Sequence, residues 1–143
     1  MRFVIDASVA VRWFVGDAAH PRADAVLQAV LTRPARFAVP ELFAYEVLAV
    51  LYRHHPRALA VFQEDVDQLL RSGVLRYPMT PHISGRSERF VQMGLTGYDA
   101  VYVALAEELE AIWLTFDSRA HDRIAAEGRS VDLAAGLPAG IVR

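Results

Sequence analysis

Hydrophobic positions along the chain form short continuous runs that alternate with longer amphipathic segments. The short runs are rich in β-branched or aromatic residues and predict buried strands at 3–5, 37–39, 74–77, 112–116 and 130–133. Helical spacing of apolar residues predicts helices at 8–15, from 21 onward, and at 41–54, 57–71, 81–93, 98–110 and 118–127. Continuously apolar strands that alternate with helices predict a parallel sheet covered on both faces.

Two of these helices carry specific expectations about burial. In the helix that Pro21 opens, Val26, Leu27, Val30 and Leu31 fall on one face and are expected to point inward. The segment 57–71 reads as a single amphipathic helix, and we expect its apolar side chains to face the core. These are Leu59, Phe62, Val66, Leu69 and Leu70.

Composition narrows the possible functions. The 143 residues fit one domain, 1–143, and the 54% hydrophobic content excludes a disordered chain. No cysteine is present, which excludes thiol catalysis, zinc fingers and iron–sulfur ligation. All fifteen basic residues are arginines, which excludes Schiff-base lysines and P-loops. No stretch reaches the roughly eighteen apolar residues of a membrane helix, and no signal peptide begins the chain, so we expect a cytoplasmic protein without a membrane partner.

Two acidic residues stand where strands end. Asp6 follows the run 3–5, and Asp117 follows the run 112–116. Each precedes a predicted helix, so an N-cap is the alternative interpretation of both. In open parallel sheets, however, ligands bind beyond the carboxyl ends of the strands, which makes both positions candidates for a site.

Two further acids interrupt apolar helices. Asp99 is the only charged residue in 98–106, and Glu46 is the only one in 42–52. Asp99 in a first turn favours the helix dipole, and Glu46 could form a buried ion pair with an arginine. Yet an unpaired carboxylate in such surroundings is costly. If all four acids converge, a divalent cation relieves their repulsion, and Mg²⁺ or Mn²⁺ prefers oxygen ligands of this kind.

In their order and spacing, four stretches resemble the PIN-domain ribonucleases, and specifically the VapC-type toxins of type II toxin–antitoxin systems. They are DASVAVRWF (6–14), VPELF (39–43) followed by EV (46–47), LTGYDAVYVALAE (95–107) and LTFD (114–117). The resemblance implies a three-layer α/β/α sandwich around a mostly parallel five-stranded sheet. It further implies an endoribonuclease that depends on Mg²⁺ or Mn²⁺, a small VapB-like antitoxin as partner, and a homodimer.

The resemblance also implies roles for single residues. Asp6, Glu46, Asp99 and Asp117 match the family's catalytic, metal-binding acids. Ser8 and Thr115 match hydroxyl positions near that site, although helix capping or strand filling would also explain them. We further regard Arg12 and Arg119 as candidate phosphate contacts, with a surface ion pair as the alternative.

The chain departs from the family pattern at two positions, and other functions remain to be weighed. Ala49 stands where many members have Asn, and Arg119 stands where some have a further acid. A phosphatase with a nucleophilic Asp6 is disfavoured, because no lysine is present and Ser8 stands where such enzymes need a second Asp. The remaining alternative is a catalytically inactive PIN-like scaffold or RNA-binding module.

Overall fold

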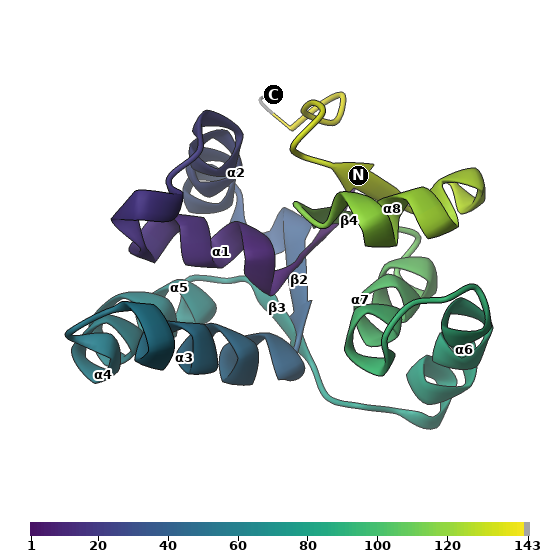
Figure 1. The fold of residues 1–143 in the computed structure, drawn as a ribbon, viewed down its shortest axis with the longest axis horizontal. Coiled ribbons are helices and arrows are strands. Elements are labelled where there is room, and N and C mark those ends of the chain that lie inside the picture. Colours follow the sequence, from purple (N-terminus) through teal and green to yellow (C-terminus); the bar gives the residue numbers. More distant parts are fainter. Residues whose placement is uncertain (142–143) are drawn as a thin grey trace.

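A five-stranded parallel sheet forms the centre of the molecule (Figure 1). The computed structural model describes residues 1–141, and within them the strands lie in the order β3-β2-β1-β4-β5, with every neighbouring pair parallel. The strands are β1 (Phe3–Ile5), β2 (Phe37–Pro40), β3 (Leu75–Tyr77), β4 (Ile112–Thr115) and β5 (Ser130–Asp132). This arrangement confirms the predicted α/β class.

Helices cover both faces of the sheet and complete three layers. Figure 1 shows α1 to α5 on one side of the strands and α6 to α8 on the other, as right-handed crossovers require for this strand order. The helices are α1 (Ala7–Phe14), α2 (Pro21–Thr32), α3 (Leu42–His54), α4 (Ala58–Val61), α5 (Asp67–Arg71), α6 (Pro81–Gln92), α7 (Gly97–Glu108) and α8 (Ser118–Ile124). Short 3₁₀ turns occupy Gly16–Ala18, Pro34–Arg36 and Ala125–Glu127.

The core lies on both sides of β1, β2 and β4. The rings of Phe3 and Phe37 stack at 5.6 Å between centroids, and those of Tyr102 and Trp113 at 6.3 Å. Helix α7 packs against β1, β2 and β4 and is covered outside by α6, so half of its residues are buried. Its alanines allow this close approach, which places the first turn of α7 at the edge of the sheet.

Two expectations about helix faces are wrong. Leu59 is 51% exposed and Leu31 is 58% exposed. The segment 57–71 is not one α-helix, because a π-helical turn at Phe62–Val66 separates α4 from α5. A π-turn adds a residue to the repeat and rotates the preceding turn, which directs Leu59 to solvent. Leu31 lies in the last turn of α2 beside the fully buried Val30, on the side of the helix that faces solvent.

Other differences concern the ends of elements. Pro40 belongs to β2 and pairs with Tyr77, so this strand extends one residue beyond the predicted range 37–39. The edge strand β3 is only partly buried, and residues 136–140 form neither helix nor strand. No helix within residues 1–141 is long and apolar enough to cross a membrane.

Candidate active site

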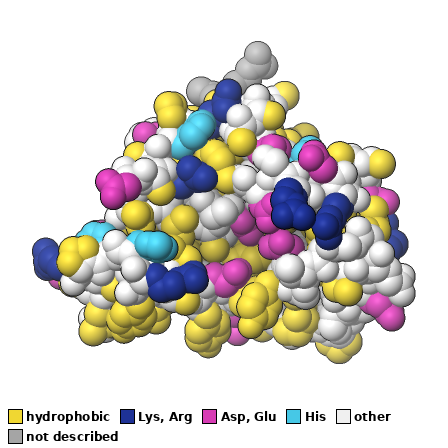
Figure 2. All heavy atoms as spheres, in the orientation of Figure 1, with side chains coloured by type: hydrophobic (Ala, Val, Ile, Leu, Met, Phe, Trp, Pro, Cys, Tyr) yellow, Lys and Arg dark blue, Asp and Glu magenta, His cyan; other side chains and the backbone are white. Residues whose placement is uncertain are grey.

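The four predicted acids meet at the carboxyl edge of the sheet. Asp6 directly follows β1, and Asp117 stands two residues beyond β4, the neighbour of β1. Glu46 lies in the second turn of α3, and Asp99 lies in the first turn of α7. The negative charges of Glu46 and Asp99 both act on Asp6, and that of Asp117 acts on Asp99. Figure 2 shows acidic side chains gathered in the central hollow of this face.

Asp6 is the most enclosed of these acids and is held by hydroxyl and amide donors. It is 7% exposed, and its Oδ2 accepts hydrogen bonds from the Ser8 amide and the Thr115 hydroxyl, both at 3.2 Å. The Thr115 hydroxyl in turn accepts from the Asp117 amide at 3.0 Å, and the Ser8 hydroxyl accepts from the Phe116 amide at 3.1 Å. The structure therefore places both predicted hydroxyls between the two acids that end strands.

Asp6 and Asp117 also cap helices, as the alternative interpretation proposed. Asp6 caps α1 through the Ser8 amide, and Asp117 Oδ1 accepts from the Ala120 amide of α8 at 3.0 Å. Each cap occupies one carboxylate oxygen. The second oxygen of each group accepts no hydrogen bond from the described part of the chain. Capping and ligand binding are thus compatible at both positions.

Glu46 is the acid with the least satisfied surroundings. Its Oε1 is buried and forms no hydrogen bond of ordinary geometry with residues 1–141, and the same holds for the Tyr102 hydroxyl, which lies close enough to lower the pKa of Glu46. The ion pair with an arginine that could have explained Glu46 is absent from this part of the chain, as it is for the other three acids. A buried carboxylate oxygen without a partner needs an explanation, and a water molecule or an ion bound at the site provides one.

The environment makes these carboxyls hold protons more tightly than free ones. Burial raises the pKa of Asp6 to about 7, with Asp99 and Glu46 adding to the rise and the Ser8 hydrogen bonds opposing it. Burial also raises the pKa of Glu46, against the effect of the nearby Tyr102 hydroxyl, and Asp99 adds to the rise. The pKa of Asp99 is raised by burial and by Asp117. In the absence of a cation, the site therefore retains protons near neutral pH.

The residues present fit a hard divalent cation that keeps part of its water shell. The donor set consists of carboxylate oxygens, among them one oxygen each of Asp6, Glu46 and Asp117 that forms no hydrogen bond of ordinary geometry within residues 1–141. Across those residues, no three His, Asp or Glu side chains converge closely enough to enclose an ion by themselves. Mg²⁺ does not require such a cage, because it binds one or two carboxylates together with water and substrate phosphate.

Basic side chains stand beside the acids in the same hollow, which has a volume of about 210 Å³. Arg119 and Arg123 lie one turn apart on α8, and Arg123 donates to the carbonyl of Gly94 in the turn before α7. The hollow is lined by Gly94, Leu95, Thr96, Asp99, Asp117, Arg119, Ala120 and Arg123. Within residues 1–141, neither Arg119 nor Arg12 forms the surface ion pair that was the alternative to a phosphate contact.

Sequence reasoning missed two residues of this neighbourhood. Arg123 follows Arg119 at the helical spacing of four, a signal that could have placed both on one face. Tyr102 gave no signal, because a tyrosine in an apolar helix reads as core, and it is indeed fully buried. Only the fold brings its hydroxyl beside Glu46.

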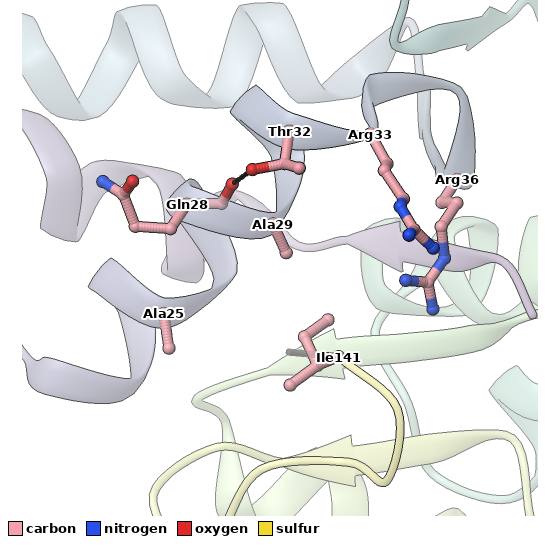
Figure 3. A pocket seen from close by; sticks show the side chains of 7 residues that line it. All are labelled: Ala25, Gln28, Ala29, Thr32, Arg33, Arg36 and Ile141. Carbon is pink, nitrogen blue, oxygen red and sulfur yellow. Dashed lines mark hydrogen bonds between the residues drawn. The ribbon is translucent and has the colours of Figure 1, made fainter. Parts of the chain in front are cut away.

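A second hollow, of about 150 Å³, is separate from the acids (Figure 3). Small side chains of α2, Ala25 and Ala29, face Ile141 across it, and Arg33 and Arg36 stand at one end. Arg36 donates to the carbonyls of Met1 and Gly140, so this hollow lies toward the amino end of β1. No acidic side chain lines it, and we assign it no part in the site.

Comparisons with known proteins agree with this architecture. A structure titled as a toxin–antitoxin complex from Klebsiella pneumoniae is 19% identical, with a TM-score of 0.64 over 90% of this chain and 94% of that one. PAE2754 from Pyrobaculum aerophilum is 18% identical, with a TM-score of 0.66 over 94% and 86%. VapC20 of Mycobacterium tuberculosis, titled as a sarcin–ricin loop cleaving toxin, is 15% identical, with a TM-score of 0.60 over 91% and 97%.

At these identities the solved structures establish the shared fold alone. No curated protein matches the sequence. The family model of the PIN domain matches residues 3–127, which include the four acids and both hydroxyl-bearing residues at the edge of the sheet. This match covers most of the chain and confirms the resemblance noted in the sequence: the chain belongs to the PIN domain family.

Proposed function

We propose that this protein is a Mg²⁺- or Mn²⁺-dependent endoribonuclease and the VapC-type toxin of a toxin–antitoxin pair. The observation that carries the proposal is the convergence of four carboxylates without an arginine partner in residues 1–141, one of them with a buried, unpartnered oxygen. Burying carboxylates that repel one another costs folding free energy, and a purely structural role for these acids does not explain that cost. The titles of two structural neighbours, which name toxins, support the biological role.

The side chains divide the work as follows. Asp6, Asp99 and Asp117 would hold the cation, directly or through water, and the hydrogen bonds from Ser8 and Thr115 fix the orientation of Asp6. When bound, the cation lowers the pKa of a water molecule and neutralises charge on the phosphate under attack. The products expected for this family are a 5′-phosphate and a 3′-hydroxyl.

Glu46 and the arginines act on water and on substrate. Because the pKa of Glu46 is raised and its Oε1 is free of protein partners in the described residues, this carboxylate can orient the attacking water and take up its proton. Arg119 lines the hollow beside Asp99 and Asp117 and is placed to contact the phosphate. Arg12, the other candidate phosphate contact, lies on α1 with its guanidinium over the ring of Phe116.

The proposed partners are RNA, a small VapB-like antitoxin and a second copy of the chain, with the cytoplasm as the place where the toxin meets cellular RNA. The molecule exposes apolar side chains that suit protein contacts. Tyr98 and Met79 are 64% and 57% exposed and border an apolar hollow of about 210 Å³, and Tyr45 is 71% exposed on α3.

The alternative is an inactive PIN-like scaffold or RNA-binding module. The observation in its favour is Ala49, which is exposed one turn beyond Glu46 and offers no hydrogen bond to it. In that case Asp6 and Asp117 would serve as caps only, and none of the four carboxylates would bind a cation.

A thermal unfolding titration with Mn²⁺ and Mg²⁺ separates these functions. Ions that bind only the folded state raise its stability by roughly 2.7 kcal/mol at a hundredfold excess over the dissociation constant. We expect this gain in the parent and in the control Asp65→Asn, which alters an exposed acid of the π-helical turn. It should be lost in Asp99→Asn, whose backbone amide keeps the Thr96 cap.

A cleavage assay on total RNA with Mn²⁺ completes the test. The parent and Asp65→Asn should cut RNA, and Asp99→Asn should be slower by on the order of a hundredfold or more. Equal cleavage by a folded Asp99→Asn variant would refute the assignment of this residue. Absence of both stabilisation and cleavage in the parent would establish the scaffold instead.

A further inference from the structure

Three side chains from separate elements form a stack next to Asp117, because one of them is Phe116, the residue that precedes this acid. The guanidinium of Arg12, from α1, lies over the ring of Phe116 with its central carbon 4.0 Å from the ring centroid. The ring of His20, at the start of α2, lies 5.0 Å from that of Phe116 and is tilted by 60°. We call Arg12, His20 and Phe116 the Arg12 stack.

Arg12 carries more hydrogen-bond donors than the protein uses. Its Nη1 donates to the carbonyl of Ala18 at 3.2 Å, which fixes the direction of the guanidinium. Its Nε is buried and has no acceptor, and no carboxylate pairs with Arg12, within the part of the chain that the structure describes. A guanidinium offers five N–H donors in a planar fork suited to phosphate oxygens. The ring of Phe116 holds this fork in place at little entropic cost.

His20 adds a second donor to the Arg12 stack. Its Nδ1 accepts a hydrogen bond from the Arg22 amide at 3.1 Å. The neutral ring therefore carries its proton on Nε2, an assignment that follows from this hydrogen bond. Nε2 has no partner among residues 1–141. The stack thus presents donors from two side chains, without an acidic side chain paired to either.

The Arg12 stack is joined to the acids through the backbone. Phe116 directly precedes Asp117, and its amide donates to the Ser8 hydroxyl, which itself lies 3.4 Å from the Thr115 hydroxyl that holds Asp6. Arg12 stands six residues after Asp6, which corresponds to roughly 9 Å along the axis of α1. Figure 2 shows basic side chains on both sides of the central acidic cluster, as a strand crossing the hollow would require.

We propose that the Arg12 stack binds a backbone phosphate of single-stranded RNA, next along the strand from the phosphate at the acids. This inference rests on the proposed function, because the acids must face RNA for a neighbouring phosphate to reach the stack. The Arg12 Nε is shielded from solvent, so the contact falls to the terminal nitrogens of the guanidinium, and of these Nη2 has no acceptor among residues 1–141. This nitrogen and the Nε2 of His20 suit an anionic acceptor such as a phosphate. Together with Arg119, which lines the hollow at Asp99 and Asp117, Arg12 gives the strand a second point of contact.

RNA binding without cleavage tests the proposal. The probe is a fluorescein-labelled oligouridine of twelve nucleotides, and its binding is measured by anisotropy in EDTA on the Asp99→Asn background. The change is Arg12→Gln, and the control is Arg71→Gln. The control removes the same charge from an exposed residue of α5 that pairs with Asp67 at 2.9 Å.

We expect Arg12→Gln to weaken binding about tenfold and to lower the salt slope by roughly 0.7, the value for one phosphate contact on a single strand. Arg71→Gln should stay within about twofold of its background. His20→Gln should weaken binding by a smaller factor. Arg12→Lys should restore the salt slope but only part of the affinity, because an ammonium retains the charge without the planar fork.

Two outcomes overturn the inference. Equal affinities and salt slopes for Arg12→Gln and Arg71→Gln, with both variants unfolding at the background temperature, would show that the stack does not contact RNA. No binding of the oligomer by the background protein at low salt would do the same. The proposed function is tested by other experiments, the Mn²⁺ titration and the cleavage assay. It fails if stabilisation and cleavage do not depend on Asp99, so failure of the proposed function can be distinguished from failure of this inference.

Discussion

Two clusters of acidic side chains in this molecule have opposite surroundings. On the outer side of α6 and α7, Arg86 pairs with Glu107 at 2.8 Å and with Glu108 at 2.5 Å. Arg89 pairs with Glu127 at 2.6 Å and also with Glu107. Every carboxylate of this network has an arginine, and the network lies at the surface, where such pairs contribute little individually.

The acids at the edge of the sheet have no such partner within residues 1–141. Asp6 and the buried oxygen of Glu46 lie deeper than any carboxylate of the surface network, and their charges repel one another. A protein with fifteen arginines could have neutralised them, as it does Glu107. The number of acidic residues in a cluster therefore does not identify the candidate site. What identifies it is that its carboxylates are buried and have no arginine partner within residues 1–141.

The largest expected effect on stability comes from Asp6→Asn. Because the pKa of Asp6 is about 7 in the folded state and the ordinary value is 3.8, the folded chain alone holds this proton at intermediate pH. The stability that this proton supplies is therefore fully present below about pH 4 and is lost as the pH rises through 7. A change in pKa of this size corresponds to roughly 4 kcal/mol as an upper limit.

We expect Asp6→Asn to raise the free energy of unfolding of the metal-free protein at pH 8 by on the order of 2 kcal/mol, and by less than half as much at pH 5. Urea denaturation in EDTA at both pH values measures the difference, with Asp65→Asn as control. If Asp6→Asn destabilises the protein equally at both pH values, repulsion among the acids is not what distinguishes the two clusters.

Asp117 allows the structural and chemical roles of one carboxylate to be separated. Asp117→Ala removes the cap of α8 and should cost about 1 kcal/mol, whereas Asp117→Ser keeps an oxygen for the Ala120 amide and should cost a few tenths. Both variants should lose stabilisation by Mn²⁺, as measured by thermal unfolding. Retained Mn²⁺ stabilisation in Asp117→Ser would leave Asp117 a cap and nothing more.

The surface network should respond least. Glu107→Gln removes the carboxylate shared by Arg86 and Arg89, and we expect a loss of roughly 0.5 kcal/mol that shrinks in high salt. Glu64→Gln, an exposed acid without an ion pair in the described residues, serves as the control. If Glu107→Gln lowered the free energy of unfolding by more than about 2 kcal/mol regardless of salt, the ion pairs at the surface would affect stability as strongly as the unpaired acids at the edge of the sheet.

The sequence predicted the structure correctly where the pattern of apolar residues depends only on burial. The apolar runs at 3–5 and 112–116 correspond to central strands, and the charge-free surroundings of Asp99 correspond to the buried helix α7. It failed in the segment 57–71, where a π-helical turn changes the faces, because periodicity assumes a constant repeat. At the site, the roles of Ser8 and Thr115 followed from the family resemblance, and the spacing of four from Arg119 could have drawn attention to Arg123, whereas Tyr102 gave no signal.

The sequence by itself determined the alternation of strands and helices and the four acids that stand out from their neighbours. Both depend on local composition, because apolar runs must be buried and a lone acid within them is anomalous wherever the chain places it. Only the tertiary structure decided which charges are paired. Parallel strands bring Asp6 beside Asp117 across more than a hundred residues, and the packing of α3 and α7 leaves Glu46 without a cation while α6 supplies two arginines to Glu107. Pairing depends on distances of a few ångströms between remote segments, which no local pattern encodes.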